Sequence, residues 1–148
     1  MYSLSVEAER RKEPAVEVYL ADYRMLNPPG EERRIYVFHL VITNTSLSAN
    51  SIKRIELTLE YGQQGQPPSN VVIPHDSSAA IAGSKEAAEV IRVPCSIAAG
   101  ATIAGAALFP IDTGLIGDGV VESHVVTVTD AHDRAVQRHA ILLWEVES

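Results

Sequence analysis

Cysteine is nearly absent from this chain, whose 148 residues contain a single one, Cys95. One cysteine excludes an intrachain disulfide, a zinc cluster built from thiolates and a Cys-x-x-Cys redox pair. The neighbours Val93 and Ile97 are apolar, which indicates a small core residue, because free cysteine is among the most buried residue types. A nucleophilic cysteine would need a histidine partner that the sequence spacing does not supply.

Long apolar runs and basic charge are also scarce. No apolar run approaches the ~18 residues of a membrane-spanning helix, so we expect no membrane span. Residues 1–14 are too polar for a signal peptide, which predicts a cytoplasmic protein, or an exported one if a leader has been removed. Lysine and arginine number 12 against 19 acidic residues, a net charge of −7. This balance argues against nucleic acid as a partner, because phosphate binding depends largely on clustered basic side chains.

The common catalytic motifs are missing as well. The sequence contains no G-x-S-x-G, no glycine-rich phosphate loop and no H-E-x-x-H. Its five histidines form no pair with the helical spacing of a zinc site, so we expect no bound metal and no cofactor. Carboxylates that folding brings together leave one alternative open, an enzyme with an acid/base site inside a sandwich or barrel cavity.

Two neighbouring runs within residues 35–61 carry the clearest pattern in the chain. Apolar residues alternate along both runs, at Tyr36, Phe38, Leu40 and Ile42 in the first and at Ile55, Leu57, Leu59 and Tyr61 in the second. Side chains on a strand alternate between two faces, so the pattern predicts a half-buried antiparallel pair joined by the polar loop 44–51.

Further strands are predicted at residues 15–24, 71–73, 90–93, 103–111, 120–129 and 135–146, separated by turn signals. Residues 84–89 can form one short helix. The glycine at 105 stands in mid-strand and predicts a bulge or a close backbone approach. The chain is therefore predicted to be an all-β, antiparallel two-sheet sandwich of seven or eight strands. Residues 15–148 would form a single domain behind a flexible arm at 1–14.

Three segments resemble the immunoglobulin-like accessory domains of bacterial proteins. They are the strand that ends in Asn44-Thr45-Ser46, the strand at residues 52–59 and the run from Ile97 to Gly105. In that family a strand ends in x-N-x-S, and a later i-x-x-G-x-x-x-x-G-x-l-x-F run forms a central strand. The resemblance covers about residues 35–111, although the paired cysteines and mid-strand tryptophan of antibody-type domains are missing. It implies a non-catalytic binding or spacer module.

The loops of such a sandwich gather at its two ends, where binding residues are often presented. Loops 44–51, 95–100 and 130–134 should share one end, and loops 61–69 and 112–119 the other. At the first end, Asp130, His132 and Asp133 lie within reach of Asn50. Calcium prefers several oxygen ligands, so a calcium-stabilised surface domain is a second alternative. The other interpretation of these residues is a turn, since aspartate hydrogen-bonds to its own backbone.

The closing strand predicts an interaction surface. If Val136 and Ala140 point inward, then Ile141 and Leu143 point outward, beside Val125 of the preceding strand. A contiguous apolar cluster on a sheet face usually marks an interface. We therefore expect a non-enzymatic protein-interaction or structural module that forms a homodimer or binds a protein partner there. The alternative is that residues 1–14 or 77–89 fold over this face and cover it.

Overall fold

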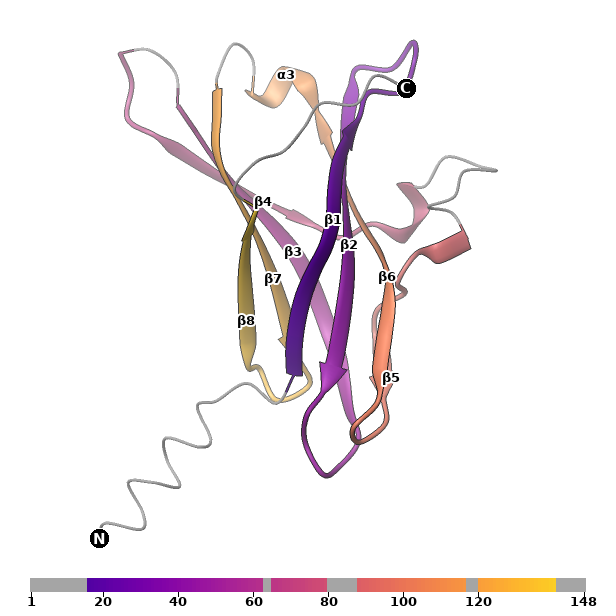
Figure 1. Ribbon diagram of the computed structural model, residues 1–148. Coiled ribbons are helices and arrows are strands. Elements are labelled where there is room, and N and C mark those ends of the chain that lie inside the picture. Colours follow the sequence, from indigo (N-terminus) through magenta and orange to yellow (C-terminus); the bar gives the residue numbers. More distant parts are fainter. Residues whose placement is uncertain (1–15, 63–64, 80–87, 117–119, 141–148) are drawn as a thin grey trace, which may run out of the picture.

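A computed structural model describes residues 16–62, 65–79, 88–116 and 120–140 (Figure 1), and this part of the chain is all-β. Two antiparallel sheets face each other, which confirms the predicted two-sheet sandwich. One turn of 3₁₀ helix, η1 (Ser77–Ala79), and one helical turn, α3 (Thr113–Ile116), interrupt the strands. The strands are β1 (Val16–Leu26), β2 (Arg33–Asn44), β3 (Asn50–Gly62), β4 (Ser69–Pro74), β5 (Cys95–Ile97), β6 (Thr102–Asp112), β7 (Val120–Asp130) and β8 (Ala135–Ala140).

Strand order explains which edges are open. The first sheet has the order β1-β2-β6, and the second has the order β4-β3-β7-β8. Strand β3 is long enough to pair with β4 along its second half and with the short β5 at its beginning. Short apolar runs predict strands at both 71–73 and 90–93, but among the described residues only the first of them forms a ladder, as part of β4.

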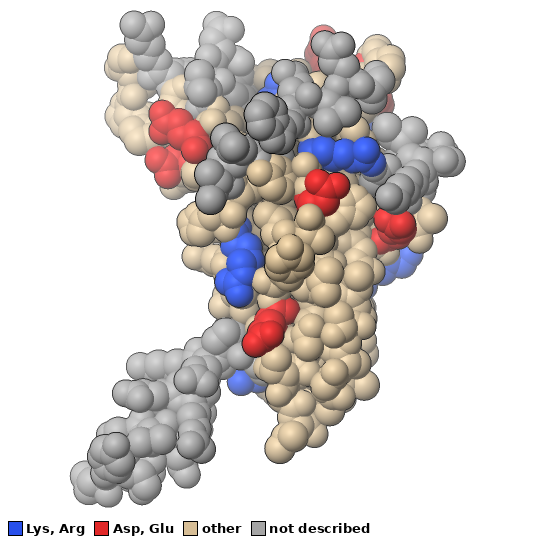
Figure 2. Space-filling model, in the orientation of Figure 1, with Lys and Arg blue, Asp and Glu red and all other residues tan. Residues whose placement is uncertain are grey.

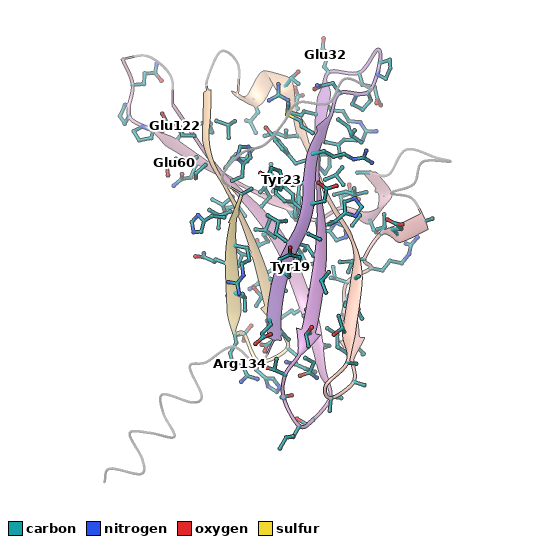
Figure 3. All side chains as sticks on the ribbon, in the orientation of Figure 1. Tyr19, Tyr23, Glu32, Glu60, Glu122 and Arg134 are labelled. Atoms are coloured by element: carbon teal, nitrogen blue, oxygen red, sulfur yellow. The ribbon has the colours of Figure 1, made fainter. Side chains whose placement is uncertain are left out.

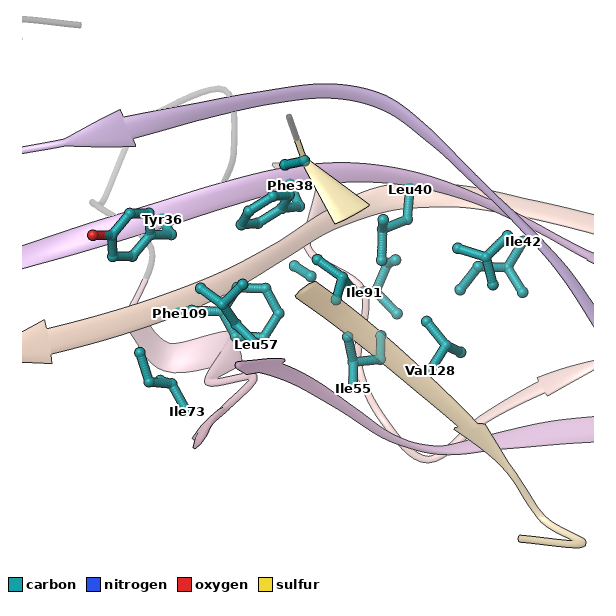
Figure 4. Packing of buried hydrophobic residues seen from close by; sticks show 14 of the residues in the cluster. Tyr36, Phe38, Leu40, Ile42, Ile55, Leu57, Ile73, Ile91, Phe109 and Val128 are labelled. Atoms are coloured by element: carbon teal, nitrogen blue, oxygen red, sulfur yellow. The ribbon is translucent and has the colours of Figure 1, made fainter. Parts of the chain in front are cut away.

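The core between the sheets follows the predicted alternation. Phe38 and Phe109 meet edge to face with ring centroids 5.8 Å apart, and Leu57 of the opposite sheet lies in the same cluster (Figure 4). The alternating residues Phe38, Leu40, Ile42, Leu57 and Leu59 are all at most 1% exposed, as are Phe109 of β6 and Val128 of β7, inward residues of the strands predicted at 103–111 and 120–129. The period-2 pattern therefore gave the inward face of each long strand correctly.

The outer face of the β1-β2-β6 sheet is also buried along part of its length. Ile35, Val37 and Leu108 point away from the main core and form a second cluster with Leu26 and Ala79. After β4 the chain crosses onto this face, so four consecutive residues of β2, 35–38, are all buried. The described parts of the predicted covering segment, 77–79 and 88–89, thus lie against this sheet, Ala79 in the second cluster and Glu89 beside Gly105 of β6. They do not pack on the face that carries Val125.

The same crossover closes the β6 edge through His75. The Asp76 N–H donates to the Leu108 carbonyl (2.9 Å), and the Leu108 N–H donates to His75 Nδ1 (2.9 Å). The other ring nitrogen, Nε2, lies 2.5 Å from the Ile91 carbonyl, while the Ile91 N–H donates to Ala106 (2.9 Å). An imidazole thus supplies hydrogen bonds that a neighbouring strand would otherwise provide.

The strand predicted at residues 90–93 is wrong. Only Val90 forms a bridge, to Ala106 of β6, and Ile91 turns its side chain into the core. The segment 89–91 can approach β6 this closely because residue 105 is a glycine. A Cβ at that position would lie 2.5 Å from the Glu89 carbonyl oxygen and 2.8 Å from Ile91 Cγ1. The predicted close backbone approach at Gly105 is therefore confirmed.

The three loops predicted to share one end do meet there. Asn44, at the end of β2, is fully buried, and its amide nitrogen donates to the carbonyls of Ser48 (3.0 Å) and Ile97 (3.0 Å). The N–H of Ala131 donates to the Ser51 carbonyl, which ties in the third loop. At the opposite end the Thr113 N–H donates to Glu32, which joins α3 to the β1–β2 connection.

Candidate binding surface

The predicted loop site is organised around Asp130, whose side chain is fully buried. One carboxylate oxygen accepts the backbone N–H groups of His132 (2.9 Å) and Arg134 (3.0 Å). The other accepts the Asn50 amide (3.1 Å) and Arg134 Nε (3.2 Å). Burial opposes ionisation, but these donors and the Arg134 charge outweigh it and lower the pKa of Asp130. Protein donors therefore occupy both oxygens, as in a turn built on an aspartate.

The remaining residues of this loop point elsewhere. Asp133 adopts a positive φ of 61° and forms an ion pair with Lys53, across the loop from Asp130. His132 is exposed and contributes its backbone N–H. The structure thus brings Asn50, Asp130 and Asp133 near one another but directs their carboxylates to different donors. Within the described ranges, no group of three or more histidine, cysteine, aspartate or glutamate side chains is arranged to hold a metal ion.

Val125 lies on the outer face of the β4-β3-β7-β8 sheet, as predicted. Its register neighbours are Thr58 on β3 and His139 on β8, and Val72 of β4 lies beyond Thr58. Val72 is 54% exposed, whereas Val125 is half-buried. Ile141 and Leu143 lie outside the described residues. In the described part, this face therefore carries a short row of β-branched residues.

Sequence reasoning missed a second surface, the seam where β1 and β8 lie side by side on one flank of the sandwich (Figure 1). Each is the last strand of its sheet among the described residues, where β1 pairs with β2 and β8 pairs with β7. One side chain crosses the seam, because Arg138 Nε on β8 donates to the Val18 carbonyl on β1 (2.8 Å). In the part of the chain that the structure describes, the seam is thus spanned by a side chain, and no backbone ladder joins β1 to β8.

Two tyrosines on β1 stand at this seam (Figure 3). The register between β1 and β2 shifts between Leu20 and Asp22, so Ala21 forms a bulge. Without the extra residue, Tyr19 and Tyr23 would share a face, since side chains alternate along a strand. With it, Tyr23 turns inward onto Phe38 (6.2 Å between ring centroids), while Tyr19 points outward and is 67% exposed.

Both flanks of β1 are hollowed. A groove of about 340 Å³ runs along the seam and is lined by Val18, Tyr19, Leu20, Tyr23, Arg138, His139 and Ala140. A second hollow, of about 390 Å³, lies beside Ala21 and reaches Val41 and Glu89 across the sheet. An exposed aromatic ring that stands between two hollows is suited to contact with another molecule.

Arg34, Tyr36 and His124 form a polar cluster between the two sheets. Arg34 Nη1 donates to the Tyr36 hydroxyl (3.3 Å), and the Tyr36 ring lies 5.5 Å from the ring of His124. Burial, together with the Arg34 charge, lowers the pKa of His124, because both disfavour the charged imidazolium. The cluster therefore keeps His124 neutral in the folded domain at neutral pH.

Comparisons with known proteins identify no family for this sequence. No protein-family model matches the sequence, and no curated protein matches it. The structural-genomics target SoR45 gives a TM-score of 0.41 at 9% identity, covering 86% of this chain and 82% of that one. The DNA-bound alkylpurine DNA glycosylase AlkC of Pseudomonas fluorescens gives 0.46 at 12% identity, covering 89% of this chain but 31% of that one. The ApaA protein of Bordetella pertussis gives 0.34 at 13% identity, covering 84% and 86%. Similarities of this size carry no argument about function.

The described residues contain no helix with the length and apolar character needed for a membrane crossing.

Proposed function

We propose that this domain is a non-enzymatic protein-interaction module of immunoglobulin-like architecture that binds a protein partner at the β1–β8 seam. The observation that carries the proposal is Tyr19, which is 67% exposed between two hollows on an edge strand. Tyrosine and arginine are enriched among the residues that dominate binding energy, and the seam presents both, with Arg138 facing Tyr19 across the groove.

The edge of β1 supports the same proposal. A strand with one paired side presents backbone donors and acceptors to an added strand. The bulge at Ala21 and the exposed Glu17 limit accidental pairing along this edge, as natural edge strands commonly do. In the regular part, residues 16–20, the Val18 carbonyl already accepts Arg138 Nε, so an extended partner segment would use the other backbone groups of this edge.

The test compares Tyr19→Ala with Leu47→Ala. Leu47 is fully exposed in the loop after β2, far from the groove lining, so it is a matched exposed apolar residue. A partner captured with the wild-type domain is purified, and its Kd is measured by calorimetry against each variant. Tyr19→Ala should weaken binding by about 30-fold, the cost of removing a dominant aromatic contact, and Leu47→Ala should leave it unchanged. Equal effects of the two substitutions would refute the seam as the contact surface.

Self-association through the outer face of the second sheet is the other form of this proposal. The row formed by Val72, Thr58 and Val125 supports it, because β-branched side chains in register give a flat contact surface. Val125→Lys should lower the mass measured by light scattering from that of a dimer to that of a monomer. A folded variant with an unchanged mass removes this face from the self-association surface.

A further inference from the structure

Arg138 is an arginine that forms no ion pair with any of the described residues. Its Nε donates to the Val18 carbonyl and its Nη1 to the Gln137 carbonyl, both at 2.8 Å. Arg33, Arg54 and Arg134 each lie within 3.3 Å of a carboxylate. Among the residues that the structure describes, no acidic side chain forms such a pair with Arg138. Its guanidinium is therefore held in place by two backbone carbonyls while its charge stays uncompensated.

The surroundings of Arg138 resemble a binding site for a carboxylate on an extended chain. Tyr19 and Tyr23 stand on the β1 side of the groove with the half-buried Leu20 between them, and the buried Val18 also borders it. Figure 2 shows basic and acidic groups scattered over the face that carries β1 and β8, with uncharged surface between those in its lower half. Among the residues that line the groove, Arg138 carries the formal charge.

We propose that the partner enters the seam as an extended segment whose central aspartate or glutamate pairs with Arg138. This inference rests on the interaction function proposed above and adds the chemistry of the ligand. A guanidinium carries five N–H donors in a planar fork that matches a carboxylate, and two of them are used here to fix its orientation. The segment lies along β1 without displacing Arg138 from the Val18 carbonyl, and its apolar residues cover the half-buried Leu20 and Tyr23.

Charge complementarity selects an acidic segment over the alternatives. A neutral strand would cover Arg138 without replacing the water around its charge, and burying an unpaired charge is costly. A lysine at the same position would add repulsion. The expected order of affinity is therefore glutamate, then glutamine, then lysine.

The experiment uses the full chain and three fluorescein-labelled peptides of alternating threonine and valine, with glutamate, glutamine or lysine at the centre. Anisotropy titrations give each Kd for the wild type, for Arg138→Gln and for the control Arg92→Gln. Arg92 is exposed beside the capped β6 edge, so this control makes the same charge change on the opposite flank. The wild type and Arg92→Gln should prefer glutamate to glutamine about tenfold, the usual gain of a charge-assisted hydrogen bond. Arg138→Gln should bind the two alike.

Equal affinity for the glutamate and lysine peptides in the wild type would overturn the assignment of an acidic ligand. So would a glutamate preference that persists in Arg138→Gln, and so would the absence of binding to any peptide. A wild-type dimer that Arg138→Gln converts to a monomer would identify the occupant as a second copy and overturn the separate partner. Each of these failures leaves the seam itself to be judged by the Tyr19→Ala and Leu47→Ala comparison.

Discussion

The two edges of the β1-β2-β6 sheet are finished in different ways. At the β6 edge, backbone from residues 75–76 and 90–91 and the ring of His75 take up the hydrogen bonds of Ala106 and Leu108. At the β1 edge, Arg138 reaches across to the Val18 carbonyl, and the exposed Tyr19 stands beside this contact. A closed edge adds to the core, whereas an open edge leaves polar backbone accessible. The difference indicates that stability is concentrated at β6 and binding at β1.

A substitution in the core between the two sheets should cause the largest loss of stability. Leu57 is fully buried in the centre of β3, within the main cluster. Leu57→Ala should lower the free energy of unfolding by about 2–5 kcal/mol, because a large aliphatic side chain leaves a cavity when it is truncated. Urea denaturation followed by circular dichroism measures this. A variant that unfolds at the wild-type denaturant concentration would place Leu57 outside the core.

Gly105 tests the closed edge directly. Gly105→Ala should destabilise the domain by about 1–3 kcal/mol, because the new methyl group collides with the Glu89 backbone, which cannot move without displacing Ile91. Gly62→Ala is the matched control in β3, where the new Cβ meets only the flexible end of Glu122, at 3.2 Å. Thermal melts of both variants give the comparison. Equal losses would mean that the close approach at Gly105 contributes nothing special.

His75 and His139 allow the two edges to be compared by the same substitution, histidine to alanine. His75→Ala should cost about 1–3 kcal/mol, because it leaves the Leu108 N–H and the Ile91 carbonyl without their partner. His139→Ala, on the exposed face of β8, should change stability by less than about 0.5 kcal/mol. Hydrogen exchange at the Leu108 amide should accelerate in the first variant and not in the second. The comparison fails if His139→Ala proves the more destabilising.

Protonation of His124 should lower the stability of the folded domain by a smaller amount that depends on pH. The pKa of His124 is lowered from 6.5 in the folded state by burial and by Arg34, so the unfolded chain binds the proton more readily. The stability that neutral His124 contributes is therefore fully present above pH 6.5 and declines as the pH falls below that value. His124→Gln should flatten the slope of melting temperature against pH between neutral pH and about pH 5. An unchanged slope would mean that other groups dominate the titration.

The sequence allowed the core and the loop ends to be predicted because both depend on local patterns. Alternation in β2 and β3 identified Phe38, Leu57 and their neighbours, and polar loops identified the turns. The second cluster around Ile35 and Leu108 was missed, since it depends on where the chain travels after β4. The same cause explains the wrong strand at 90–93, where Gly105 on a distant strand admits Ile91.

The seam was missed because edge position is not a local property. The outward direction of Tyr19 was visible in its alternation with Val18 and Leu20, but nothing nearby showed that β1 would have one neighbour. An outward aromatic residue on the first predicted strand was the available signal. At the predicted loop site the sequence did place Asp130 and Asn50 together, but their function was not visible in it. The two side chains hydrogen-bond to each other and stabilise the turn.

The buried amide of Asn44 has a consequence for how this domain can be produced. Asn44-Thr45-Ser46 satisfies the acceptor pattern for N-linked glycosylation, in which a sugar is attached to the asparagine side-chain nitrogen. That nitrogen donates to Ser48 and Ile97, and the side chain is fully enclosed, so the folded domain has no room for a glycan there. In a secretory host, modification before folding would compete with folding itself. The native fold would then be reached only by chains that escaped the transferase, which makes a host without this pathway the better choice for expression.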